Sequence, residues 1–295
     1  MLFSMDSFSE EDMMQSGNPL LHGRNLAAAG MSDISASGGK ALFYAHSLEI
    51  DGTWTEKYIK EFSRGVAEVL KETGCSFMGG DFGEAERWHY TAAVIGVPFF
   101  EPVKRTGAEP GDIIYITGRV GAANLEAFLE LEKRKIFFKT AAKLTSFSVK
   151  IRKREAGLAG RYASSCIDTS DGLYSGLMSI AGLNGTGFII DRIPYCRTGL
   201  AAASVFKLPA VLLALGECGE YELLFTVRAE DEEEFEREAE NENMQFYKIG
   251  KVTESGRYII EKGRRINIGR LSISARDFRS RKKYFTALVK ELDKL

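Results

Sequence analysis

The sequence predicts an α/β (α+β) protein with two domains, residues 1–102 and 103–295. Strand and helix patterns alternate along the first hundred residues, which is typical of this class. A cluster of prolines among polar residues, at Pro98, Pro102 and Pro110, indicates the boundary between the domains. The chain has 295 residues, of which 44% are hydrophobic, so each domain can bury a core of its own.

Hydrophobic periodicity separates strands from helices in the first domain. The best-defined helix follows Thr55, a residue that can cap its N-terminus, and it ends at Gly74. Residues 24–38 are rich in alanine and predict a helix that breaks up at glycine and serine, whereas residues 9–23 look irregular. The predicted strands are 1–8, 40–50, 75–81 and 88–97.

The second domain begins with a Pro-Gly-Asp turn that leads into a strand. Phe235 and Ala239 are four residues apart in an acidic stretch, which predicts a solvated helix with one narrow buried stripe. The predicted strands are 113–117, 185–191 and 222–227, with a closing hairpin formed by 247–252 and 257–263. The predicted helices are 124–134, 139–163, 175–183, 230–240 and an amphipathic C-terminal helix from 279 to 295.

Composition argues against several classes of partner. The formal net charge of −2 gives no sign of a nucleic-acid surface, and no apolar run approaches the roughly 20 residues that span a bilayer. The four cysteines form no CxxC pair and the three histidines are scattered, so zinc is not expected. We therefore expect a cytoplasmic protein with reduced thiols and with neither a nucleic-acid nor a membrane partner.

The segment CIDTSDGL, residues 166–173, is the strongest chemical signal. Asp168 and Asp171 flank Ser170 where a strand-like run, with Ile167 facing the core, gives way to small polar residues. Carboxylate oxygens suit Mg²⁺, and grouped carboxylates need a cation or a proton to coexist. Taken singly, each Asp can also be a turn or helix-capping residue. The aspartates at or near strand ends, beside small residues, are Asp6, Asp33, Asp81, Asp168 and Asp171.

Two further features suggest phosphate binding. The glycines before Asp81, including Gly80, could let backbone approach a phosphate, and the planar guanidinium of Arg105 could hold one. Turns use the same glycines, and an isolated arginine is often only a surface residue. The P-loop, protein-kinase and GxSxG signatures are absent from the sequence, so a nucleotide would bind by another architecture.

Five short motifs together resemble the thiamine-monophosphate kinase family, of the superfamily that includes aminoimidazole ribonucleotide synthetase. SDISASG, GGD, RTGAEPGDIIYITG, CIDTSDGL and YELLFTV occur in the family's order and approximate spacing. The resemblance runs from about residue 3 to residue 278. It implies two α/β domains, the N-terminal one pairing its sheet with that of a second subunit in a homodimer. It also implies ATP and Mg²⁺ between the domains, and transfer of a phosphoryl group to thiamine phosphate, a small-molecule acceptor.

The resemblance also implies roles for individual residues. Asp168 and Asp171 match metal-binding aspartates at the centre of catalysis, and Asp6, Asp33 and Asp81 match further Mg²⁺ ligands. Gly80, Arg105 and Ser170 match contacts to ATP. Domain 1–102 would then carry dimerisation and part of the metal and nucleotide site, and 103–295 the nucleotide and acceptor side.

The acceptor side departs from the family pattern. The family's opening segment with its G-D-D-A-A motif is missing, and Met13 and Met14 stand where the family has a His-Phe pair. Gly219 replaces a substrate-contacting glutamate, unless Glu217 or Glu220 serves instead, and the closing aromatic has no match around Ser272. Three readings remain open: a thiamine-phosphate kinase, an ATP-dependent enzyme with another acceptor, and an inactive binding or scaffold protein.

Overall fold

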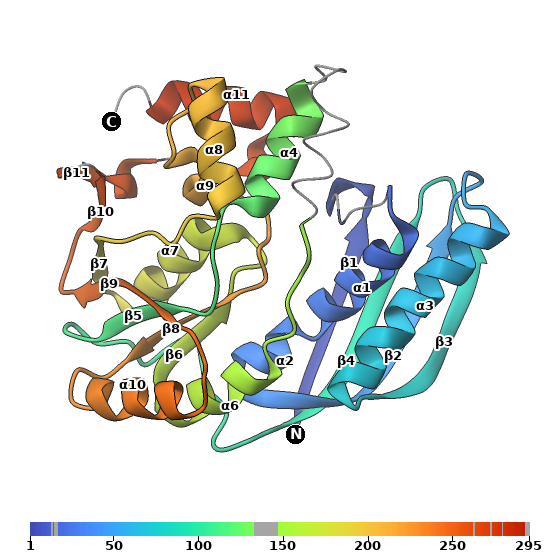
Figure 1. Ribbon diagram of the computed structural model, residues 1–295, viewed down its shortest axis with the longest axis horizontal. Helices are drawn as coiled ribbons and strands as arrows, with labels where there is room; N and C mark the ends of the chain where they lie inside the picture. Colours follow the sequence, from blue (N-terminus) through green and yellow to red (C-terminus); the bar gives the residue numbers. More distant parts are fainter. Residues whose placement is uncertain are drawn as a thin grey trace. The chain divides into compact units, whose positions relative to one another are not determined.

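The chain forms two compact units (Figure 1). The computed structural model describes every residue except 13, 15, 16, 133–146, 262, 272, 279 and 293–295. Unit 1 comprises Met1–Pro102 and Phe147–Arg161, and unit 2 comprises Val103–Ser146 and Tyr162–Leu295. Residues 147–161, assigned to the second domain from the sequence, therefore pack with unit 1.

Unit 1 is built on a four-stranded sheet with the order β1-β4-β2-β3. The middle pair is antiparallel, β1 pairs antiparallel with β4, and β3 runs parallel to β2 at the other edge. The strands are β1 (Leu2–Ser9), β2 (Gly39–Ile50), β3 (Ser76–Glu84) and β4 (His89–Pro98). Side chains alternate between a helix-covered face, with Tyr44, Tyr90 and Val94 fully buried, and an open face.

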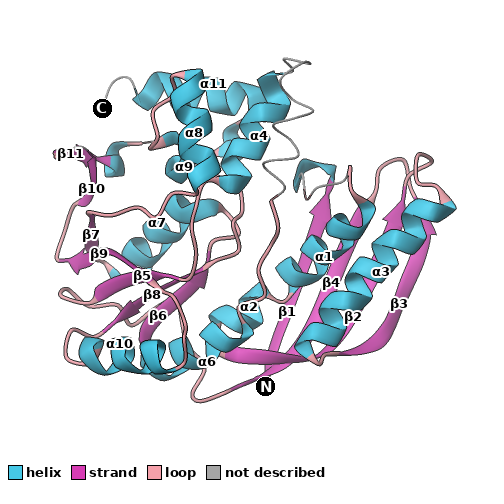
Figure 2. Ribbon diagram, in the orientation of Figure 1, coloured by secondary structure: helices cyan, strands magenta, loops and turns pink. Residues whose placement is uncertain are grey.

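Helices cover one face of this sheet (Figure 2). They are α1 (Pro19–Gly30), α2 (Ser32–Ala36) and α3 (Glu56–Thr73), preceded by the short η1 (Glu10–Asp12). The backbones of α1 and α3 approach so closely that a side chain on Gly23 would overlap the carbonyl oxygen of Phe62. A side chain on Gly65 would likewise overlap the carbonyl oxygen of Leu20.

The sequence pattern predicted both ends of α3 but missed the start of α1. Thr55 caps α3 by accepting a hydrogen bond from the Tyr58 amide, and Gly74 ends it at φ 71°, as predicted. The prediction that residues 9–23 are irregular is wrong, because α1 begins at Pro19 with Asn18 as its N-cap. The glycines of β3 do not end that strand either, since it continues to Glu84 through a register irregularity.

A buried amide attaches residues 147–149 to unit 1. The Asn25 side chain is fully buried, donates to the carbonyl of Phe147 at 3.3 Å and accepts from the Val149 amide at 3.0 Å. Helix α6 (Lys153–Tyr162) follows, and its Gly160 lies against the backbone of Gly38. The sequence predicted a helix over 139–163, of which residues 139–146 lie outside the described part of the chain.

Unit 2 contains a seven-stranded sheet with the order β11-β10-β7-β9-β5-β8-β6. The predicted hairpin of 247–252 with 257–263 is wrong, because β7 lies between these two strands, antiparallel to one and parallel to the other. The actual hairpin joins β10 to β11. The strands are β5 (Ile113–Ile116), β6 (Ala163–Asp168), β7 (Gly187–Ile190), β8 (Leu223–Val227), β9 (Tyr247–Thr253), β10 (Arg257–Glu261) and β11 (Arg264–Asn267).

Both faces of this sheet are covered, which is why all of β8 is buried. Leu224 packs into the main core with Leu177 of α7, whereas the next residue, Phe225, meets the ring of Phe235 of α10. Buried Phe235 and Ala239 confirm the narrow stripe predicted for this acidic helix. The helices are α4 (Ala122–Glu132), α7 (Gly172–Asn184), α8 (Arg197–Phe206), α9 (Leu212–Leu215), α10 (Glu232–Asn241), η2 (Ile268–Arg270), η3 (Ala275–Asp277) and α11 (Arg281–Leu292).

Within the described ranges, no helix combines the length and apolar character needed to cross a membrane. All four cysteines are free thiols, as expected.

Candidate functional site

The turn between β6 and α7 holds three of the predicted residues together in unit 2. Asp168 is the last residue of β6 and is 5% exposed, and Ser170 Oγ donates to its Oδ1 at 3.1 Å. Asp171 occupies the N-cap position of α7, and its side chain is 61% exposed. Gly172 has φ 82°, and a Cβ there would lie 2.6 Å from the carbonyl oxygen of Gly216, so this tight turn requires glycine.

The loop before β8, residues 216–222, holds this turn through hydrogen bonds to Thr169. Thr169 donates its amide to the Glu222 carbonyl at 2.8 Å, and its carbonyl accepts from the Glu220 amide at 3.0 Å. Its hydroxyl accepts from the Glu222 amide at 2.9 Å. Tyr221 between them adopts φ 55°, an uncommon conformation for a residue with a Cβ. The Asp168–Asp171 turn and loop 216–222 therefore form one rigid substructure.

Two buried glutamates in that loop have structural partners. Glu222 accepts from Thr117 Oγ1 at 2.6 Å. Glu220 accepts from the amides of Gly121 and Ala123, at 2.7 and 3.1 Å, where α4 begins. Burial raises the pKa of Glu220 to about 8, and the backbone amides offset this only in part. Glu220 thus faces the start of α4.

A C-terminal segment contacts the same substructure. Glu217 Oε2 accepts from Ser274 Oγ at 3.0 Å and from the Ala275 amide at 2.9 Å. Its own amide donates to the hydroxyl of Tyr284 at 3.0 Å. One residue beyond Ala275, Arg276 Nη2 lies 3.4 Å from Asp171 Oδ2. Ser272, around which the sequence offers no match for the family's closing aromatic, lies outside the described residues.

In unit 1, Asp6 and Asp33 lie on either side of one hydroxyl. Ser4 Oγ is 3.1 Å from Asp6 Oδ2 and 3.0 Å from Asp33 Oδ2. A hydroxyl has one proton, so it satisfies one of these carboxylates at a time. Asp6 lies near the end of β1, whereas Asp33 lies in the first turn of α2, so the expectation that Asp33 sits at or near a strand end is wrong. The paired strand and helix bring the carboxylates together instead.

Asp81 and Gly80 lie on the edge strand β3. Asp81 is exposed and is in register with Ser47 of β2, within a strand rather than at the strand end that was predicted. A side chain on Gly80 would overlap the carbonyl oxygen of His46, so close packing against β2 already requires glycine there.

Arg105 belongs to unit 2 and follows Lys104, whose carbonyl accepts from the Cys166 amide of edge strand β6 at 2.9 Å. Its carbonyl accepts from Asn184 Nδ2 at 3.0 Å, at the C-terminal end of α7. The Asn184 side chain also accepts from the amides of Gly107 and Ala108 at 2.7 and 3.1 Å. The positive charge of Arg105 counters the rise in the pKa of buried Cys166, two residues before Asp168. The backbone of Arg105 therefore lies at the end of α7 opposite Asp171.

The predicted residues thus form an Asp6–Asp33 pair in unit 1 and an Asp168–Ser170–Asp171 turn in unit 2. Over the described residues, no group of three or more His, Cys, Asp or Glu side chains could hold a metal alone. Mg²⁺ commonly binds through one or two carboxylates, keeping several waters and adding substrate phosphates. The carboxylate donors present fit that mode of binding.

Sequence analysis did not identify Ser4 or Arg276. Ser4 is two residues from Asp6, so period-2 alternation on β1 could have indicated that they share a face. Arg276 pairs with a residue 105 positions away, and no local pattern could have revealed that. Of the Met13–Met14 pair, Met14 is buried, while Met13 lies outside the described residues.

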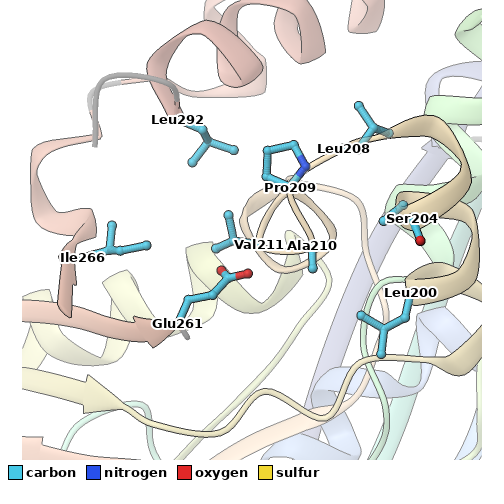
Figure 3. Close-up of a pocket in the computed structure, with 10 residues that line it drawn as sticks. Leu200, Ser204, Leu208, Pro209, Ala210, Val211, Glu261, Ile266 and Leu292 are labelled. Atoms are coloured by element: carbon cyan, nitrogen blue, oxygen red, sulfur yellow. The ribbon is translucent and has the colours of Figure 1, made fainter. Parts of the chain in front are cut away.

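A separate cavity of about 420 Å³ lies in unit 2 between α8, the β10–β11 hairpin and the end of α11 (Figure 3). Its walls are mainly apolar, with the Glu261 carboxylate facing inward. None of the predicted site residues is among those that line it.

Comparison with known proteins defines the class of this two-domain architecture. The model of the AIR synthase related protein, N-terminal domain, matches residues 1–97, and that of the C-terminal domain matches residues 109–263. The chain belongs to the AIR synthase related family. This confirms the predicted fold class.

Individual relatives narrow the comparison within the family. The thiamine-monophosphate kinase of Pyrococcus horikoshii is 31% identical over 240 residues, covering 80% of this chain and 73% of the relative. That of Pyrococcus abyssi is 29% identical over 244 residues, covering 83% and 75%. A complex of AaThiL with AMPPCP and TMP is similar in fold, with a TM-score of 0.74 and 23% identity over 90% of this chain and 84% of that one. The predicted resemblance to thiamine-monophosphate kinases is confirmed.

Proposed function

We propose that this protein is an ATP- and Mg²⁺-dependent phosphotransferase that converts thiamine phosphate to thiamine diphosphate. The observation that carries the proposal is the similarity to thiamine-monophosphate kinases over four fifths of the chain. The similarity in fold to a protein crystallised with AMPPCP and TMP supports it. The Asp168–Asp171 turn supplies the carboxylates that such a reaction requires.

Asp168 and Asp171 would hold Mg²⁺ in unit 2, and Asp6 and Asp33 would do so in unit 1, with Asp81 as a further ligand. Bound Mg²⁺ supplies charge neutralisation on the ATP phosphates. Buried Asp168 is fixed by Ser170, whereas exposed Asp171 can move to meet a ligand. The proposed ATP contacts are Ser170, Gly80 and Arg105.

The chain's own contribution would be positioning. Loop 216–222 holds the Asp168–Asp171 turn through Thr169, so the backbone that carries the two carboxylates is in place before substrate arrives. A phosphate acceptor is already an anionic nucleophile, so the reaction needs no dedicated general base.

The proposal includes a homodimer formed through the open face of the unit 1 sheet. Strand register aligns Phe3, Ile95 and Phe43 in one row across this face, and they are 66, 37 and 40% exposed. The next row carries Met5, which is 65% exposed, beside Ala93 and Ala45. A contiguous apolar sheet face of this kind favours a partner surface of the same composition.

Light scattering tests the dimer. Met5→Lys should convert the dimer to a monomer, because it buries a charge in the proposed interface. Ser7→Lys, two residues along the same face at its polar end, should weaken the dimer much less. A monomeric wild-type protein at micromolar concentration would contradict this part of the proposal.

The free thiols support a cytoplasmic location as part of the same proposal, because reduced cysteines are typical of that compartment.

The decisive assay follows ADP release with ATP, Mg²⁺ and thiamine phosphate. Asp171→Asn should lower kcat by about 100-fold or more while the far-UV circular dichroism spectrum stays unchanged. Glu233→Gln, on the exposed face of α10, is the control and should behave like wild type. No ADP release by the wild-type protein, together with no ATP binding by calorimetry, would overturn the proposal. If the protein binds ATP but releases ADP only with other acceptors, the proposed substrate changes and the phosphotransferase proposal stands.

A further inference from the structure

Arg276 is a cation placed directly beside the carboxylate turn of unit 2. Its Nη2 lies 3.4 Å from Asp171 Oδ2, and the two side chains are 83% and 61% exposed. An ion pair this exposed adds little to stability. The contact uses one of the five N–H donors of the guanidinium, and the Arg276 side chain is largely exposed.

The backbone beneath Arg276 is held firmly, although its side chain is exposed. Ser274 and Asp277 form a capping box around η3, in which the Ser274 hydroxyl accepts from the Arg276 amide at 3.3 Å. Glu217 accepts from both Ser274 and Ala275 and so attaches this segment to the loop that supports the Asp168–Asp171 turn. The backbone of Arg276 therefore stays close to Asp171, while its guanidinium remains free to turn.

The charge of the surrounding residues defines what Arg276 can bind. Asp168, Asp171 and Glu217 lie on the two adjoining loops, and their carboxylates would repel an anionic substrate. A guanidinium at the edge of this group attracts an anion and matches the oxygens of a phosphate with two parallel hydrogen bonds. Mg²⁺ on Asp171 would compete with the ion pair and release the guanidinium for such a ligand.

We propose that Arg276 recognises the phosphate monoester of the acceptor, exchanging its ion pair with Asp171 for that phosphate when Asp171 takes up Mg²⁺. The inference rests on the proposed function, since it names the residue that selects a phosphorylated acceptor. It makes Arg276 a specificity-determining residue and assigns no bond-forming step to it.

Calorimetry with Mg²⁺ and AMPPCP present tests the inference. Arg276→Ala should weaken thiamine phosphate binding by about 10-fold or more, and Arg276→Lys by less, because lysine keeps the charge but loses the fork. Affinities for thiamine, which lacks the phosphate, and for AMPPCP should stay within about twofold. Arg270→Ala, an exposed arginine on the neighbouring η2, is the matched control and should behave like wild type.

A Mg²⁺ titration without other ligands separates recognition from a structural role. Arg276→Ala should bind Mg²⁺ as tightly as wild type or more tightly, because Asp171 loses a competing cation, whereas a disordered turn would bind it more weakly. The inference is overturned by an unchanged affinity of Arg276→Ala for thiamine phosphate, by an equal loss for AMPPCP, or by weaker Mg²⁺ binding. It is also overturned if wild type binds thiamine phosphate no more tightly than thiamine. If binding of thiamine phosphate depends on Arg276 but no ADP is released, the phosphotransfer proposal fails and the inference about Arg276 stands.

Discussion

Replacing Glu220 with glutamine should change how the stability of unit 2 depends on pH. Glu220 is 3% exposed, and burial raises its pKa from 4.5 to about 8. Below pH 4.5 the folded and unfolded chains both carry the proton, and above it only the folded chain keeps it. The free energy of unfolding should therefore fall by about 1.4 kcal/mol per pH unit as pH rises towards 8. Over the whole interval the loss is on the order of 5 kcal/mol.

Glu220→Gln keeps an acceptor for the amides of Gly121 and Ala123 but cannot ionise. Urea unfolding at pH 5.5, 6.5 and 7.5, followed by far-UV circular dichroism, gives the difference between wild type and variant at each pH. The free energy of unfolding of the variant minus that of wild type should rise by about 1.4 kcal/mol per pH unit, because the contributions of other groups cancel. Glu233→Gln, an exposed glutamate, should show no such trend. A difference between wild type and Glu220→Gln that is independent of pH would refute the assignment of a protonated, buried Glu220.

Three further changes test the packing of each unit. Burial lowers the pKa of His22 to about 3, so the free energy of unfolding of unit 1 should fall by about 1.4 kcal/mol per pH unit as pH falls from 6.5. His22→Phe should remove that slope in urea unfolding followed by fluorescence of the adjacent Trp54 and Trp88. A slope retained in the variant would contradict this. Gly65→Ala should lower the free energy of unfolding by about 1–3 kcal/mol or more in the same assay, because its methyl group would overlap the α1 backbone. Gly52→Ala, where the added methyl group meets open space, should be nearly neutral. Equal values for the two variants would be inconsistent with the close α1–α3 contact. Phe235→Ala should lower the free energy of unfolding of unit 2 by about 3–5 kcal/mol, measured by circular dichroism, since its ring is fully buried, and a loss below about 1 kcal/mol would show that α10 does not pack as described.

Sequence patterns predicted those parts of the fold that depend on neighbouring residues. The Thr55 cap, the apolar spacing of α3 and Gly74 are local signals that can be read from neighbouring residues. The start of α1 at Asn18 and Pro19 was also encoded, as an N-cap followed by proline, but apolar spacing before residue 24 is too weak to indicate it alone. Strands β7, β9 and β10 were all predicted, whereas their pairing was not, because pairing with β7 is decided by packing between distant segments.

The same limit applies to the candidate site. Asp168, Ser170 and Asp171 are contiguous, so one turn predicts their proximity. The Asp6–Asp33 pair depends on α2 folding over β1, and no spacing rule relates a strand residue to a helix residue 27 positions later. Gly80 shows a different limit: the backbone of β2 already requires a glycine there, so the glycine by itself does not indicate phosphate binding.

The discontinuity of unit 1 has a consequence for how the protein is made. All four strands of its sheet have been synthesised once β4 is complete, yet the segment that covers Asn25 is synthesised only after the chain has entered unit 2. At roughly 5–20 residues per second, the 59 residues from 103 to 161 take about 3–12 s to appear. During that interval Asn25 of α1 lacks its Phe147 and Val149 partners, and the sheet has its open apolar face. We therefore expect unit 1 to be most exposed to misassembly during translation, at a stage that refolding of the full-length chain does not reproduce.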